Sequence, residues 1–207
     1  MKIALFGATG RVGGEILSLL LKNNHYVTVL VRNPEKLKPH VNLTVIKGNA
    51  RVKSDIEKTL DSVDGVISAL NTDQTTVLTE AIAHIISIME KQNIKRIVTI
   101  GTGGILSSRV NPELLRYQSS ESKQKSTVAA KEHHKVYDML KETLLDWTII
   151  CPTYLPTGAT TNAFIIERDR LPIGAVQTTT GDTALFAYKE LMESNHIGHR
   201  VGIMSPK

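Results

Sequence analysis

The sequence is poor in cysteine, with Cys151 as the only one in 207 residues. A single cysteine excludes an intramolecular disulfide and a metal site built from cysteines alone. Cys151 lies in the apolar run WTIICP. Because a free cysteine in such a run usually behaves as a small buried hydrophobe, we expect a core residue rather than a nucleophile.

Long hydrophobic runs are also missing. Stretches such as ILSLLL fall far short of the roughly 20 apolar residues that a membrane-spanning helix requires. The first residues lead into an expected strand and show no cleavable signal pattern. We therefore expect a soluble cytoplasmic protein with no membrane partner.

Aromatic residues are scarce, at 4% of the chain, although the formal net charge is +5. The basic residues are spread along the sequence, and no aromatic platform for stacking bases is visible. We therefore expect no nucleic-acid partner. The positive charge instead favours anionic small molecules, among them phosphorylated cofactors.

Strand-like and helix-like patterns alternate along the whole chain, which predicts an α/β fold. Most of the strand-like stretches are continuously apolar, as is typical of strands buried on both faces. The alternation predicts a single Rossmann-type, doubly wound parallel sheet with helices on both faces, in one domain. The expected strands are residues 2–7, 26–32, 43–48, 65–70, 96–101, 147–152 and 199–205, and the expected helices are 13–24, 55–62, 77–93, 131–144 and 182–195.

A glycine-rich turn, GATGRVG at residues 7–13, separates the first expected strand from the first helix. Gly7 permits a tight turn, Gly10 lets the backbone approach a pyrophosphate, and Gly13 or Gly14 allows close packing of the helix. Backbone N–H groups at the helix start would bind phosphate, although such a turn can also serve packing alone. The residues expected at a cofactor are Gly7, Thr9, Gly10, Arg11, Val12 and Gly13.

The end of the second expected strand, VLVRNPEKL, favours NADP(H) over NAD(H). Arg32 stands about 20 residues beyond the glycines, where an NAD site would offer an acidic side chain to the ribose. The planar guanidinium of arginine suits a 2′-phosphate instead. Lys36 and Arg11 are weaker helpers, and the alternative is an exposed arginine without a ligand.

The ends of later strands supply further expected cofactor contacts, because open parallel sheets bind ligands beyond the carboxyl ends of their strands. Gly48 and Asn49 would lie near adenine. Glycines after the fifth strand would let the backbone approach nicotinamide. The remaining expected contacts are Ala69, Leu70 and Asn71, near the ribose and diphosphate, and Gly101, Thr102, Gly103 and Pro152.

Motifs along nearly the whole chain resemble the atypical short-chain dehydrogenase/reductase superfamily. They are GATGRVG, VRNPEKL, GNA, VISALN, IVTIGTGG and LLDWTIICPTYLPTG. The similarity is to the small NAD(P)H-binding group that includes NmrA-like proteins and the flavin reductase/biliverdin reductase B type. The resemblance implies that residues 1–207 form a single NAD(P)-binding Rossmann domain.

The tyrosine and lysine pair that many members of the superfamily use has no match at the expected place. YDMLK, Tyr137 to Lys141, ends close before the sixth strand, whereas the family pair lies near the start of that helix. Near the family position stands Lys131, with Thr127 four residues earlier. We therefore predict that the Tyr-x-x-x-Lys dyad is absent and that Tyr137 packs the helix.

The flavin reductase type also lacks this dyad, so the resemblance implies an oxidoreductase that transfers hydride from NADPH to a flat conjugated acceptor. The acceptor would be a quinone, a flavin such as FMN or FAD, or a similar molecule. Similarity to this type makes Thr102 and Tyr154 the candidate catalytic residues. The alternative is a non-catalytic NADP(H) sensor that binds a partner protein, as NmrA-like relatives are thought to do.

Two further features bear on the site. The polar, serine-rich segment from Ser107 to Thr127 is either a lid or disordered. The histidines show no metal-ligand spacing, and the adjacent His133 and His134 would point in different directions on a helix. We therefore expect no metal site, and the sequence leaves the oligomeric state open.

Overall fold

The computed structural model describes residues 1–73, 75–122 and 126–206. Eight strands form one sheet, in the order β3-β2-β1-β4-β5-β6-β8-β7. All neighbouring strands are parallel except β7, which runs antiparallel to β8. The strands are β1 (Lys2–Phe6), β2 (Tyr26–Val31), β3 (Leu43–Lys47), β4 (Gly65–Ser68), β5 (Arg96–Ile100), β6 (Asp146–Pro152), β7 (Ile165–Arg168) and β8 (His199–Met204).

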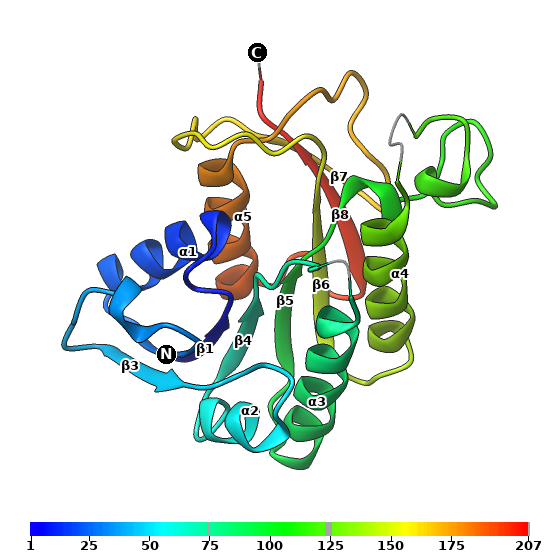
Figure 1. Ribbon diagram of the computed structural model, residues 1–207. Coiled ribbons are helices and arrows are strands. Elements are labelled where there is room, and N and C mark those ends of the chain that lie inside the picture. The colour runs from blue at the N-terminus through cyan, green and yellow to red at the C-terminus, as the bar shows by residue number, and fades with distance from the viewer. Residues whose placement is uncertain (74, 123–125, 207) are drawn as a thin grey trace.

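Helices cover both faces of this sheet. In Figure 1, α1 and α5 lie on one side, and α2, α3 and α4 lie on the other. The predicted Rossmann-type architecture is confirmed, and the strand order reverses direction between β1 and β4, where such folds bind dinucleotides. The helices are α1 (Arg11–Lys22), α2 (Lys53–Thr59), α3 (Val77–Lys91), α4 (Val128–Lys141) and α5 (Thr180–Glu193), with short 3-10 helices η1 (Pro34–Lys36), η2 (Gly103–Ile105) and η3 (Arg116–Gln118).

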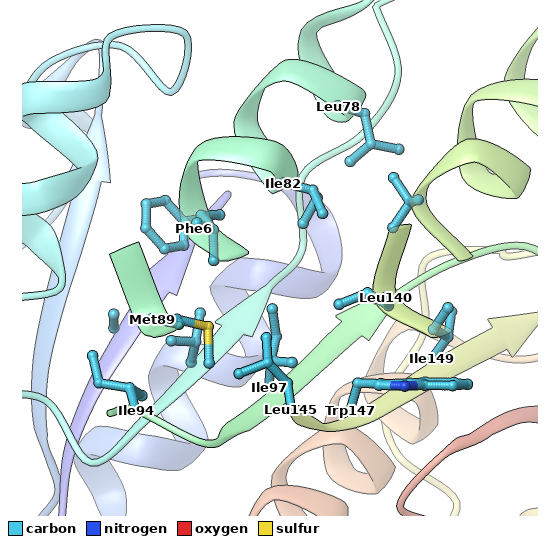
Figure 2. Close-up of a cluster of buried hydrophobic side chains, with 14 of the residues drawn as sticks. Phe6, Leu78, Ile82, Met89, Ile94, Ile97, Leu140, Leu145, Trp147 and Ile149 are labelled. Carbon is cyan, nitrogen blue, oxygen red and sulfur yellow. The ribbon is translucent and has the colours of Figure 1, made fainter. Parts of the chain in front are cut away.

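Alternating side chains of the strands build two hydrophobic clusters, one on each face. In β1, Phe6 belongs to the cluster under α3 and α4, whereas Leu5 belongs to the one under α1 and α5. Figure 2 shows the first cluster, where Ile82 of α3 and Leu140 of α4 lie over strand residues such as Ile149. Burial on both faces explains why the central strands have continuously apolar sequences.

Two expectations about the sheet need correction. The seven expected strands are present, but β7 was not anticipated, and its antiparallel direction makes the sheet mixed rather than purely parallel. β3 is not buried on both faces, since it lies at the sheet edge and Val45 remains 37% exposed. An edge strand has one neighbour only, so its side chains receive less cover.

Cys151 is fully buried in β6, as predicted. Burial raises the pKa of its thiol to about 12, so the thiolate needed for nucleophilic chemistry does not form near neutral pH. Within the described ranges, no helix is long and apolar enough to cross a membrane.

Candidate functional site

The glycine-rich turn follows β1 directly and packs against Ala69, the residue that follows β4. Gly7 adopts a φ of +82°, in the left-handed region that favours glycine. A Cβ at this position would lie 2.4 Å from the carbonyl oxygen of Ala69. The N–H of Gly10 donates to the Gly7 carbonyl at 2.9 Å and closes the turn. Only a residue without a side chain fits at Gly7.

The start of α1 is shaped to receive an anion. Gly10 occupies the N-cap position and provides no side-chain cap, and the first helical turn contains no acidic residue. A Cβ on Gly13 would come within 2.0 Å of the Gly7 carbonyl oxygen, so the helix lies directly against the turn. The uncapped N–H groups and the positive end of the helix dipole therefore fit a phosphate group. Val12 is buried, whereas Thr9 and Arg11 are exposed.

The exposed Arg11 also connects the turn to a distant segment. Its guanidinium donates to the carbonyl oxygen of Leu155, after β6, at 2.9 Å. This contact brings the segment that follows β6 next to the glycine-rich turn. Arg11 can therefore position the backbone around a cofactor as well as bind an anion itself.

Arg32 lies directly after β2, which pairs with β1 so that Leu30 stands opposite Phe6. Arg32 therefore projects from the same edge of the sheet as the glycine turn. Its side chain is exposed and makes no hydrogen bond or ion pair with any described residue. Its guanidinium is therefore free for a ligand, and Lys36 in η1 is also exposed.

Asn49 and Asn71, the two asparagines expected at the cofactor, form hydrogen bonds within local turns. The side-chain oxygen of Asn49 accepts from the Arg51 N–H at 3.0 Å, and its own N–H donates to Asp55 at 3.1 Å. The side chain of Asn71 accepts from the Thr72 N–H at 2.9 Å. Both residues follow their strands at the expected edge, where they shape the backbone. Ala69 and Leu70, between β4 and Asn71, are partly buried.

A cavity of about 660 Å³ opens at the carboxyl ends of β5 and β6. It brings together the two candidate catalytic residues, Thr102 and Tyr154, although 51 positions separate them in the chain. Thr127, which stands where the family tyrosine was expected, also lines it. The other lining residues are Gly103, Gly104, Arg116, Tyr117, Glu121, Ser122, Ser126, Ala129, Ala130, Thr153, Leu171, Ala175 and Val176.

Local hydrogen bonds hold both Thr102 and Tyr154 in place. Thr102 caps η2, and its hydroxyl accepts from the Gly104 N–H at 3.4 Å. The carbonyl of Tyr154 accepts from the Thr178 N–H at 2.8 Å, while its side chain remains 68% exposed. The Tyr154 hydroxyl can therefore turn towards a molecule in the cavity, and the Thr102 hydroxyl, which accepts from Gly104, still has its own hydrogen to donate.

Gly101 and Pro152 take part in packing at the ends of β5 and β6, and neither is among the described residues that line the cavity. A Cβ on Gly101 would approach Cγ2 of Ile149 to 2.6 Å, so this glycine is needed for packing against β6. Pro152 is buried at the end of β6. Its carbonyl oxygen lies 3.3 Å from the place of a Cβ on Gly103, which does line the cavity.

The second half of the segment from Ser107 to Thr127 supplies part of the cavity lining; residues 123–125 of that prediction lie outside the described residues. Ser107 pairs with Leu115 in an isolated antiparallel bridge, and the Arg116 N–H donates to the Leu106 carbonyl at 2.8 Å. The Tyr117 hydroxyl lies 2.9 Å from Nδ1 of His134 on α4. These contacts attach the described part of the segment to η2 and α4 beside the cavity.

Sequence comparison agrees with this geometry. Residues 7–194 match the family described as NAD(P)H-binding. The chain belongs to this NAD(P)H-binding family. The match runs from the first glycine of the turn to the end of α5, and it confirms the resemblance that the motifs indicated.

Similar proteins align with this chain over nearly their whole length. The uncharacterized protein YwnB of Bacillus subtilis (strain 168) is 25% identical over 203 residues, covering 97% of this chain and 95% of YwnB. A Bacteroides thetaiotaomicron structure with a suggested epimerase function has 26% identity and a TM-score of 0.84, covering 100% of this chain and 97% of that one. A Streptococcus pneumoniae TIGR4 structure with a suggested NADH-flavin reductase function has 22% identity and a TM-score of 0.84, and both chains are covered completely.

In this NAD(P)H-binding protein, the residues of YDMLK are engaged away from the cavity. The ring of Tyr137 packs edge-on against Trp147, with 5.9 Å between ring centroids, and the Arg200 guanidinium lies 4.3 Å from the Tyr137 ring centre. Lys141 pairs with Asp138 at 2.9 Å. Neither Tyr137 nor Lys141 lines the cavity, and Lys131 is exposed.

The adjacent histidines of α4 have different surroundings. His133 is buried, and burial lowers its pKa to about 4 against the opposing effect of Glu132. His134 is partly exposed and contacts Tyr117 and Asp138. Among the residues that the structure describes, no group of three or more histidine, cysteine or acidic side chains is arranged for a metal ion.

Proposed function

We propose that this protein is an NADPH-dependent reductase that passes hydride to a flat conjugated acceptor such as a flavin or a quinone. The observation that carries the proposal is the cavity at the carboxyl ends of β5 and β6, on the same edge of the sheet as the glycine turn. Arg11 of the turn binds the carbonyl of Leu155, the residue that follows Tyr154 of the cavity lining. The cavity volume of about 660 Å³ falls within the usual range for small-molecule sites.

The lining of the cavity suits a flat ring. Gly103, Gly104, Ala129 and Ala130 present backbone and small side chains. A planar molecule can therefore approach closely, and the hydroxyls of Thr102 and Tyr154 supply hydrogen bonds that orient it. When bound, the nicotinamide supplies the hydride. The protein contributes mainly proximity and orientation, which can account for a large part of the rate of such a transfer.

The preference for NADPH is proposed from the free guanidinium of Arg32, beside the glycine turn. A bidentate pair between arginine and a 2′-phosphate would favour NADPH over NADH by roughly ten- to a hundredfold. The net charge of +5 acts in the same direction, because it attracts polyanionic cofactors.

We further propose that hydride transfer here proceeds without a Tyr-x-x-x-Lys dyad. Thr127, which lines the cavity, is a poor proton donor, and Tyr137 is packed between Trp147 and Arg200. Reduction of an isolated carbonyl needs a positioned acid, whereas the chemistry of a flavin resides in the flavin. Flavins and quinones are therefore the acceptors that this site suits.

The proposal is tested by mixing the protein with NADPH or NADH and following the nicotinamide absorbance while FMN, and then a simple quinone, is added. We expect oxidation of NADPH that depends on both protein and acceptor. Binding of NADPH without oxidation across a broad acceptor panel would instead support an NADP(H) sensor.

A pair of tyrosine variants links the activity to the cavity. Tyr154→Phe removes the hydroxyl at the cavity mouth, and Tyr26→Phe removes one from a similarly exposed tyrosine at the opposite end of the sheet. We expect Tyr154→Phe to raise the KM for the acceptor and Tyr26→Phe to leave the kinetics unchanged. Equal kinetics for both variants would place the acceptor elsewhere.

A further inference from the structure

A second, smaller cavity adjoins the one described above. It has a volume of about 210 Å³ and shares Arg116, Glu121, Leu171 and Ala175 with the larger cavity. Because the same four residues line both spaces, a molecule whose ring occupies the larger cavity could extend a short chain into the smaller one.

Arg116 lines both cavities, and its guanidinium makes no hydrogen bond to a described residue. Its side chain is only 20% exposed, and its Nε is buried without a hydrogen-bond partner. The Oε1 atom of Glu121 lies 3.7 Å from Nε, too far for a hydrogen bond. The terminal nitrogens donate to no described residue. Since a buried N–H group is costly to leave without a hydrogen bond, the unsatisfied Nε indicates a missing acceptor.

Glu121 does not supply that acceptor, because other donors already hold its carboxylate. The Arg109 N–H donates to it at 2.8 Å, and the Ser108 hydroxyl and the Val110 N–H also contribute. Burial alone would raise the pKa of Glu121. These hydrogen bonds and the charge of Arg116 outweigh burial and hold the pKa below its usual range. The carboxylate is thus satisfied largely without Arg116.

The second arginine of the smaller cavity is already engaged. Arg109 pairs with Glu167 and donates to the Leu171 carbonyl at 3.0 Å. Among the described residues that line the two cavities, Arg116 therefore carries the positive charge that is available to a ligand.

We propose that Arg116 binds an anionic group of the acceptor, a phosphate monoester or a carboxylate joined to the flat ring by a short chain. The planar guanidinium can bind such a group through two parallel hydrogen bonds. This assignment rests on the proposed function, since it names the acceptor class of the same site. FMN fits the description, and riboflavin, which has the same ring without the phosphate, does not.

The test compares the binding of FMN and riboflavin in the presence of NADP⁺, measured by quenching of flavin fluorescence, with wild-type protein and three variants. The wild type should bind FMN at least about tenfold more tightly than riboflavin. Arg116→Met should abolish this difference while riboflavin binding persists. Arg168→Met removes the same charge from an exposed site on β7 and should preserve the difference.

Glu121→Gln should change the affinity for FMN in the opposite direction to Arg116→Met. The amide oxygen can still accept from the Arg109 N–H, while the negative charge beside Arg116 is lost. FMN should therefore bind more tightly to this variant, and riboflavin should bind as it does to the wild type. The Glu121→Gln variant also tests the role of Arg116 if Arg116→Met fails to fold.

The outcomes separate the two proposals. Equal binding of FMN and riboflavin by the wild type, with both flavins reduced, overturns the role of Arg116 and leaves the reductase standing. Equal weakening of both flavins by Arg116→Met also overturns it, because that result indicates a structural role. If the wild type binds neither flavin and oxidises NADPH with neither, the reductase proposal fails for flavins and the role of Arg116 fails with it.

Discussion

The carbonyl oxygen of Gly7 lies where a side chain on Gly13 would have to be, since a Cβ on Gly13 would come within 2.0 Å of it. The neighbouring Gly14 differs, because its Cβ would lie 3.6 Å from the nearest backbone atom, an ordinary contact. Gly13→Ala should therefore push α1 away from the turn and lower the free energy of unfolding by about 1–3 kcal/mol. It should also weaken NADPH binding.

Gly14→Ala is the matched control for this variant. It replaces a helical glycine without a clash and should raise the free energy of unfolding by up to about 1 kcal/mol. Urea unfolding and NADPH titration of both variants check the prediction. Similar behaviour of the two would show that close packing of helix and turn does not hold the cofactor site.

Arg32→Ala tests the choice of cofactor. If the guanidinium binds the 2′-phosphate, the Kd for NADPH should rise roughly ten- to a hundredfold, while the Kd for NADH should change little. Lys36→Ala, on the adjoining η1, should have a smaller effect. Isothermal titration with both nucleotides measures the difference, and equal weakening of NADPH and NADH would contradict the assignment.

The YDMLK segment gives a prediction about catalysis. Tyr137→Phe keeps the ring that packs against Trp147 and removes only the hydroxyl. Lys141→Met breaks an exposed pair with Asp138, an interaction that contributes little to stability. Both variants should keep the wild-type rate of NADPH oxidation. A large loss of kcat with unchanged KM in either one would show that this pair acts as the catalytic dyad after all.

The buried His133 should make stability depend on pH. Its pKa of about 4 in the folded protein lies below the unfolded value of about 6.5, because burial disfavours the charged imidazolium. The unfolded chain therefore binds a proton more readily. The contribution of the neutral imidazole is fully present above pH 6.5 and is lost as the pH falls towards 4, by an amount of about 3 kcal/mol.

His133→Leu isolates this contribution, because leucine cannot bind a proton. Free energies of unfolding at pH 7.5 and pH 5 should fall less for the variant than for the wild type. His40→Gln removes an exposed histidine and should show the wild-type dependence. The same loss of stability in all three proteins would contradict the role of His133.

The fold could be predicted from the sequence because its signals are local. The central strands are short, mostly apolar runs and most helices carry an apolar stripe, so the seven expected strands and five expected helices are all present. β7 could not be predicted from the sequence, because Ile165–Arg168 is a four-residue edge strand with two charged side chains. Its pairing with β8 depends on residues that lie far away in the chain.

The candidate site could be predicted only in part. Thr102 and Tyr154 follow consecutive strands of the sheet, so the rule for carboxyl ends places both at the cavity. Arg116, Tyr117 and Glu121 come from a polar segment without periodicity. Their position depends on contacts such as that of Tyr117 with His134, which no local pattern encodes. Two arginines and two glutamates in one long loop after the fifth strand were the signal available.

Direct hydride transfer is tested most directly by rapid mixing of the NADPH-loaded protein with FMN in the absence of oxygen. The absorbance of the nicotinamide and that of the oxidised flavin should fall together at one rate. Deuterium at one of the two C4 positions of NADPH should slow both absorbance changes. Stable NADPH binding with no change in either absorbance, for FMN and for quinones, would contradict the account.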